Sequence, residues 1–144
     1  MSFSFVDEIL FLEPGERGKI ATFTVIPTSG PYLDGPFRPA GVPPSLVLEC
    51  LAQSAGCLIR ATYRGRGVLP IRVEEVQFQE PLRASERLTA QSELLGVHGD
   101  PESTATIWAF GEASVDGRPV ATARLFFLVF QADSRGMAWE RMIR

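Results

Sequence analysis

GPFRPAGVPPSLVLECLAQ (35–53) joins a glycine- and proline-rich loop to an almost wholly apolar segment. Pro43 and Pro44 suit the first turn of a helix, where a missing backbone N–H costs least. Gly65 can adopt the left-handed conformation that ends a helix. The pattern therefore predicts a long helix over residues 44–64, entered from an irregular loop.

One carboxylate, Glu49, lies within this apolar helix, and Gln53 follows one turn later. Residues four apart share a helix face, so the Gln53 amide can orient the Glu49 carboxylate. Burying an unpaired ionised group costs several kcal/mol. An acid in such a helix therefore indicates a partner or a chemical role, and Glu49 and Gln53 are the candidate catalytic residues.

Strands are predicted on both sides of the helix, because apolar and polar residues alternate there with a period of two. Ala21 and Phe23 alternate with Thr22 and Thr24, for example. Asp-Gly between two such runs is a strong hairpin signal. The expected strands cover residues 5–12, 17–26, 70–79, 86–96, 103–115 and 118–131, with the Asp-Gly turn at residues 116–117.

A helix that is apolar all round needs cover on every side. One antiparallel sheet curled around it would bury most of its surface, which is an α+β arrangement. We therefore expect a single domain over residues 1–144, with a C-terminal tail at 133–144. A second subunit could cover what the sheet leaves open, so the pattern also favours a homodimer or a higher oligomer.

The composition excludes several classes of protein. The chain has 144 residues, 45% of them hydrophobic, and a formal charge of −3, without the basic stripe of a nucleic-acid binder. No apolar run reaches the roughly 20 residues of a membrane-spanning helix. The N-terminus lacks the pattern of a secretory signal, so a cytoplasmic location is expected.

The cysteines and the histidine do not indicate a metal or cofactor site. Cys50 and Cys57 are seven residues apart in the predicted helix, or about 10 Å, which is too far for a disulfide. His98 is the only histidine, and GVHGDPES is interpreted as a turn between strands. One histidine and two helical cysteines cannot assemble a metal site. No cofactor is expected.

Three segments carry a resemblance to a known family. These are VDEILFLEPGERGKIATFTV (6–25), LVLECLAQSAG (46–56) and VEEVQFQEPLRASERL (73–88). In order and spacing they resemble the 3-hydroxyacyl-[acyl-carrier-protein] dehydratases of fatty-acid synthesis. The second segment keeps the family's Glu-x-x-Ala-Gln helix signature. The resemblance implies a hot-dog fold, in which an antiparallel sheet wraps around a long central helix.

The resemblance also implies a chemistry and a partner. The family removes water from a 3-hydroxyacyl thioester carried on acyl-carrier protein or coenzyme A. A histidine takes the proton next to the thioester carbonyl, and the helix carboxylate, here Glu49, helps the hydroxyl to leave. A backbone N–H at the start of the helix polarises the carbonyl.

The sequence departs from the family pattern in the loop before the helix. The family loop reads like GHFPGxPxxPG, whereas this chain has GPFRPAGVPP, so Pro36 stands where the histidine is expected. Pro44 stands at the glycine expected to donate an N–H, which proline lacks. Asp34 or the backbone N–H of Ser45 could substitute in part. Phe37 matches the family's phenylalanine, so Phe37 and Ser45 are the candidate substrate-binding residues.

Three functions therefore stay open. The first is a dehydratase-like enzyme with an altered site, acting on or binding 3-hydroxyacyl thioesters. The second is a thioesterase that uses the single carboxylate of Glu49. The third is a non-catalytic acyl-thioester binder, or a partner subunit in a hetero-oligomer with a histidine-containing homologue.

Three arginines at residues 60, 64 and 66 gather where the predicted helix ends. They could contact a phosphate of phosphopantetheine or an acidic carrier protein. The simpler interpretation is that cations are favourable at the negative end of a helix.

Overall fold

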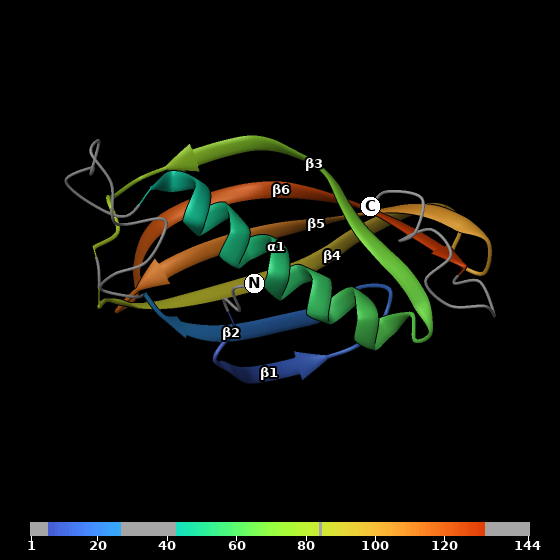
Figure 1. Ribbon diagram of the computed structural model, residues 1–144, viewed down its shortest axis with the longest axis horizontal. Coiled ribbons are helices and arrows are strands. Elements are labelled where there is room, and N and C mark those ends of the chain that lie inside the picture. Colours follow the sequence, from blue (N-terminus) through green and yellow to red (C-terminus); the bar gives the residue numbers. More distant parts are fainter. Residues whose placement is uncertain (1–5, 27–42, 84, 132–144) are drawn as a thin grey trace, which may run out of the picture.

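The structure is a computed structural model that describes residues 6–26, 43–83 and 85–131. In that part of the chain, one helix lies against one antiparallel six-stranded sheet (Figure 1). The strand order across the sheet is β1-β2-β4-β5-β6-β3. The elements are β1 (Glu8–Glu13), β2 (Lys19–Val25), α1 (Pro44–Thr62), β3 (Arg66–Phe78), β4 (Arg87–Asp100), β5 (Thr104–Val115) and β6 (Arg118–Gln131).

The sheet curves around α1 and buries one side of that helix. Every second residue of β5, and of β4 as far as Leu94, is buried under it, as the period of two predicts. Leu51 and Leu58 of the helix are fully buried, together with Ile107 and Phe127 of the sheet. The predicted α+β fold, with an antiparallel sheet wrapped around a long helix, is therefore confirmed. No helix in the described residues is long and apolar enough to cross a membrane.

The turns follow from local sequence. Asp116 and Gly117 have φ angles of 50° and 79°, the left-handed pair that a two-residue hairpin turn requires, so the Asp-Gly prediction is confirmed. Gly65 has a φ of 78°, as expected, but α1 ends at Thr62. The Thr62 hydroxyl donates to the Leu58 carbonyl (2.8 Å) and accepts from the Gly15 N–H (3.1 Å), which joins the end of the helix to the β1–β2 turn.

Two predicted strand boundaries were wrong by four residues. β3 begins at Arg66, four residues before the predicted start, because its first residues pair with the end of β6. β4 runs to Asp100, so His98 is an exposed strand residue opposite Thr106 and not part of a turn. Both errors arise because pairing with a neighbouring strand extends a strand beyond its own apolar pattern.

The two outermost strands of the sheet are β1 and β3 (Figure 1). β3 pairs with β6 along one side, and its other backbone edge has no strand beside it among the described residues. Exposed apolar side chains follow this strand, at Leu69, Ile71, Val73 and Phe78. An exposed apolar edge of this kind is a template for pairing with another chain.

Candidate functional site

One side of α1 is left open by the sheet, and this side carries Glu49. Ser45, Glu49 and Arg60 are exposed there, and Ala52 and Gln53 are half-buried. The angular spacing of 100° per residue places Glu49, Gln53 and Arg60 in one row along the helix. We call the row formed by Glu49, Gln53, Gly56 and Arg60 the open stripe.

The Glu49 carboxylate is held by its neighbour on the open stripe. The Gln53 amide donates from Nε2 to Glu49 Oε1 at 3.2 Å. The spacing of four residues predicted this contact. The expected burial of Glu49 is not found, because the residue is exposed within the single chain. The desolvation cost therefore arises only if something else covers the open stripe.

Apolar side chains of β3 lie on the same side of the sheet as α1. Val73 pairs with Leu125 and Phe78 pairs with Ala121, and both of these β6 partners are buried beneath the helix side of the sheet. Directly paired residues point to the same face of a sheet. Val73 and Phe78 nevertheless remain 41% and 48% exposed. β3 contacts α1, so this strand with its exposed apolar side chains lies beside the helix.

The start of α1 offers one N–H donor near the open stripe. Pro43 is the N-cap and makes no side-chain cap, and Pro44 has no N–H. The Leu46 N–H is used by the Pro43 carbonyl at 3.0 Å. Ser45 is therefore the first residue of the helix with an N–H to give, and its side chain is exposed. The residues expected before the helix, Asp34, Pro36 and Phe37, lie outside the described residues.

Behind the open stripe, the helix is packed against polar as well as apolar groups. Cys50, next to Glu49, is 1% exposed, and burial raises the pKa of its thiol to about 12, with the Glu49 charge adding to the shift. On the same buried side, the Thr22 hydroxyl donates to the Ser54 hydroxyl at 2.9 Å. Cys50 is therefore an inert core residue. Both cysteines are free, as expected.

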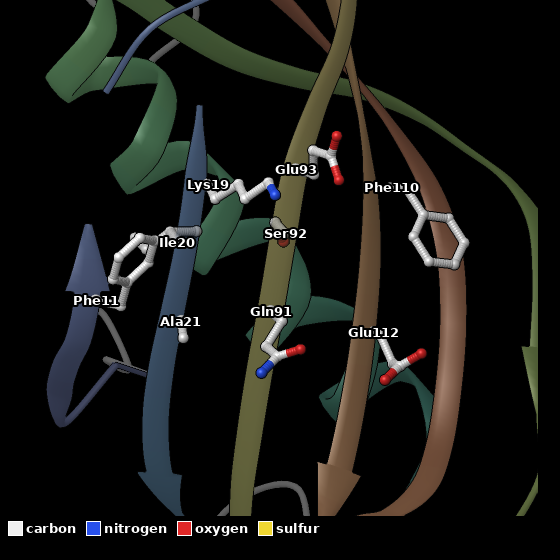
Figure 2. A pocket seen from close by; sticks show the side chains of 9 residues that line it. All are labelled: Phe11, Lys19, Ile20, Ala21, Gln91, Ser92, Glu93, Phe110 and Glu112. Carbon is white, nitrogen blue, oxygen red and sulfur yellow. The ribbon is translucent and has the colours of Figure 1, made fainter. Parts of the chain in front are cut away.

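A surface depression of about 420 Å³ lies on the opposite face of the sheet (Figure 2). Most of its side chains belong to the strand positions that alternate with the helix-facing ones; Ile20 and Ser92 are the buried exceptions. The side chains of Ala21 and Gln91 are shorter than the rings of Phe11 and Phe110 on either side of them, and the depression lies over these shorter side chains. Lys19 is paired opposite Glu93 at one end. Because this face points away from α1, the depression is separate from Glu49 and open to solvent.

His98 and the cysteines do not join Glu49 in a site. His98 is at the β4–β5 hairpin end of the sheet, far along the sheet from the start of α1 (Figure 1). In the residues that the structure describes, no group of three or more histidine, cysteine or acidic side chains could hold a metal ion. The described chemistry near the open stripe therefore rests on one carboxylate and one amide.

Sequence reasoning found Glu49 and Gln53 but missed the exposed residues of β3. Their alternation predicts only which face of the sheet they share. Their exposure depends on where the helix crosses the sheet. Arg60 was noticed only as one of several cations near the helix end, and its position on the open stripe could have been read from its spacing of eleven residues from Glu49.

Comparison with known proteins identifies the family. The family described as "FabA-like domain" matches residues 1–124, and the chain belongs to this family. A 3-hydroxyacyl-[acyl-carrier-protein] dehydratase FabZ of Ruminiclostridium cellulolyticum is 27% identical over 133 residues, covering 90% of this chain and 89% of that protein. The FabZ of Thermotoga petrophila is 32% identical over 108 residues, covering 74% of each chain.

Solved structures show the same fold at lower identity. The dehydratase heterocomplex ApeI:P from Xenorhabdus doucetiae superposes with a TM-score of 0.67 at 17% identity, covering 94% of this chain and 88% of that chain. A hypothetical thioesterase with coenzyme A from Streptococcus pneumoniae has a TM-score of 0.66 at 15% identity, covering 88% and 90%. The hot-dog fold expected from the sequence is confirmed.

Proposed function

We propose that this member of the FabA-like family binds 3-hydroxyacyl thioesters along the open stripe and uses Glu49 in their dehydration. The observation that carries the proposal is the Glu49 carboxylate, held by the Gln53 amide at 3.2 Å on the side of α1 that the sheet leaves open. Val73 and Phe78 supply apolar surface beside it for an acyl chain. The FabZ relatives are dehydratases of this substrate class.

The chemistry divides into two proton movements. The Asp34 carboxylate, which precedes α1 in the sequence, is the base proposed to take a proton from C2 of the substrate, and the C2–H electron pair forms the C2–C3 double bond. The C3–O bond breaks, and the protonated Glu49 carboxyl gives its proton to the departing hydroxyl, which leaves as water. The Ser45 N–H, at the start of α1, is the donor proposed for the thioester carbonyl. Gln53 is a positioning residue that fixes the direction of the Glu49 carboxyl.

A second copy of the chain would complete the cover of this site. We propose a homodimer in which the free edge of β3 and the open stripe face the second subunit. The exposed apolar residues of β3 support this arrangement. Light scattering on the purified protein should give the mass of a dimer, or of a higher oligomer built from it. Val73→Glu should shift the mass toward the monomer, whereas Val97→Glu, at an exposed position of β4, should not.

The activity test is hydration of an enoyl thioester, which is the reverse reaction, followed by loss of its ultraviolet absorbance. Glu49→Gln should lower turnover by about 10²–10⁴-fold, the usual contribution of general acid–base catalysis. Glu93→Gln, a carboxylate on the opposite face of the sheet, serves as the matched control and should turn over normally. Equal rates for both variants would refute the role of Glu49. Release of free thiol instead of hydration would favour a thioesterase.

A partner-subunit function is the second candidate. The chain has no histidine before residue 98, so a homodimer lacks the base that the family resemblance implies. The superposition on a subunit of a dehydratase heterocomplex supports this candidate. In that case the purified chain alone is inactive, and mixing it with a histidine-containing homologue from the same organism restores turnover that depends on Glu49.

A further inference from the structure

A cation lies on the open stripe beyond Glu49, over a glycine. The Arg60 side chain turns back along α1, so that its Nη1 is 3.2 Å from where a Cβ on Gly56 would be. Helical side chains lean toward the N-terminus, which brings the guanidinium one turn nearer to Glu49 than its own Cα. The absence of a side chain at Gly56 leaves the space in which the guanidinium lies.

Arg60 differs from Arg66 at this end of the helix, whereas Arg64 is exposed like Arg60. Arg66 forms an ion pair with Glu102, and its side chain is only 19% exposed. Within residues 6–26, 43–83 and 85–131, no acid forms an ion pair with Arg60, and the side chain is exposed. Favourable placement at the negative end of the helix explains a cation there. The ordinary lean of helical side chains then directs the guanidinium along the same row as Glu49, so both charged groups lie on the open stripe.

If another molecule covers the open stripe, the Arg60 guanidinium needs an anion as its partner. The proposed dimer takes the stripe out of water, and a charge removed from water is strongly unfavourable unless an anion pairs with it. The described part of the chain supplies no such anion to Arg60. A ligand that lies along the stripe can supply the anion.

We infer that Arg60 binds a carboxylate at the far end of the acyl chain, so that the site prefers acyl thioesters with a terminal carboxyl group over plain fatty acyl thioesters. This inference rests on the proposed function of Glu49. The guanidinium lies at the level of Gly56, seven residues from Glu49, which is about 10 Å along the helix. A chain of about eight to nine single bonds spans this distance, because three bonds of an extended chain advance about 3.3–3.6 Å.

The phosphate of phosphopantetheine is the other anion that an acyl thioester carries. Its distance from the reacting carbons exceeds the separation of Glu49 and Arg60, because the whole pantetheine arm lies between them. A terminal carboxylate on a medium-length acyl chain matches the separation. A guanidinium also binds a carboxylate through two parallel N–H···O bonds, which gives the contact its selectivity.

The test compares two thioethers of pantetheine that carry no phosphate and cannot react. One has an undecyl chain, and the other has an ω-carboxydecyl chain of equal length. Calorimetric titration of the full-length protein should show about tenfold tighter binding of the carboxylate probe, typical of a charge-assisted contact. Arg60→Gln should abolish this preference, so that the variant binds the two probes with equal affinity. Arg64→Gln, the matched control on the neighbouring turn, should keep the preference.

Four results would overturn the inference. Equal binding of the two probes by the unaltered protein, or a preference that survives in Arg60→Gln, would remove the role of Arg60 and leave the acyl-thioester site intact. Loss of undecyl-coenzyme A binding in Arg60→Gln, without loss of undecyl-pantetheine binding, would assign Arg60 to the phosphate instead. If neither probe binds to the unaltered protein, the proposed function fails together with the inference. Circular dichroism of each variant verifies that α1 is retained.

Discussion

Replacement of Gly56 by alanine is the most direct test of how the open stripe is built. A glycine inside a helix makes the folded state less stable than an alanine does, by about 0.5–1 kcal/mol. The added Cβ would meet only the end of the Arg60 side chain, with Nη1 at 3.2 Å and Cζ at 3.9 Å. An exposed guanidinium can move aside at little cost. Gly56→Ala is therefore expected to stabilise the chain by about 0.5–1 kcal/mol, although Gly56 itself is buried.

Urea unfolding measures this effect. With a slope of about 1.5 kcal/mol/M, the midpoint should rise by about 0.3–0.7 M while the slope stays constant. Gly96→Ala is the contrasting variant, because its Cβ would lie 2.4 Å from Cζ2 of the Trp108 ring. The indole ring is rigid and cannot move aside like the end of an arginine side chain. Gly96→Ala is therefore expected to lower the free energy of unfolding by about 1–3 kcal/mol.

A loss of stability in Gly56→Ala would refute the reasoning, since it would mean that something other than Arg60 occupies the space over Gly56. The double variant Gly56→Ala/Arg60→Ala refines the result. If moving the guanidinium carries a cost, the alanine at position 56 should stabilise more strongly when Arg60 is absent. Equal gains in both backgrounds would show that Arg60 moves freely.

Three further predictions concern the buried side of α1. Folding raises the pKa of the Cys50 thiol from 9.0 to about 12, so the unfolded chain loses the thiol proton first as pH rises. The contribution of Cys50 to the free energy of unfolding is therefore complete below pH 9. Above pH 9 the free energy of unfolding falls by at most about 1.4 kcal/mol per pH unit. Urea unfolding from pH 8 to 10.5 should show a steeper decline for the unaltered chain than for Cys50→Ala, and parallel curves would contradict this. Thr22→Val should cost about 1–3 kcal/mol by leaving the Ser54 hydroxyl unpaired, and Thr22→Val/Ser54→Ala should recover part of the loss; additive losses in thermal unfolding would argue against the 2.9 Å contact. Leu51→Ala should cost about 3–5 kcal/mol, because Leu51 is fully buried and its Cδ2 faces the backbone of Gly111; a loss below about 1 kcal/mol in the same assay would mean that the core closes over the cavity.

The strand predictions succeeded because a strand with one buried face must place apolar residues at every second position. In β5, every second residue from Ala105 to Val115 is buried, and the alternation alone fixed the face of each residue. The bounds of β3 were harder to predict, because most of its residues are exposed. Its pairing with β6 also contains two irregularities, and one of them includes Glu75 at a φ of 51°. Local pattern carries little information about such an irregular edge strand.

The candidate site was predicted only in part. The contact between Glu49 and Gln53 depends on spacing within one helix, so the sequence was enough to predict it. The sequence did not predict that the sheet of the same chain leaves Glu49 exposed. The almost wholly apolar sequence of the helix suggested that it is covered on every side. A single sheet, however, can cover only part of the circumference of a helix. The catalytic roles of Glu49 and Gln53, and the substrate contacts of Ser45 and Phe37, stay predictions.

The sequence by itself determined the family, the order of strands and helix, and the single carboxylate of LVLECLAQ (46–53), because these depend on local periodicity and on motifs. The replacement of two groups of the family pattern by Pro36 and Pro44 stays a prediction. Only the tertiary structure decided which side of α1 is open, since that depends on how far the sheet curls around the helix. The uncovered edge of β3 and the guanidinium over Gly56 follow from that packing, because neighbours distant in the sequence decide which surfaces remain exposed.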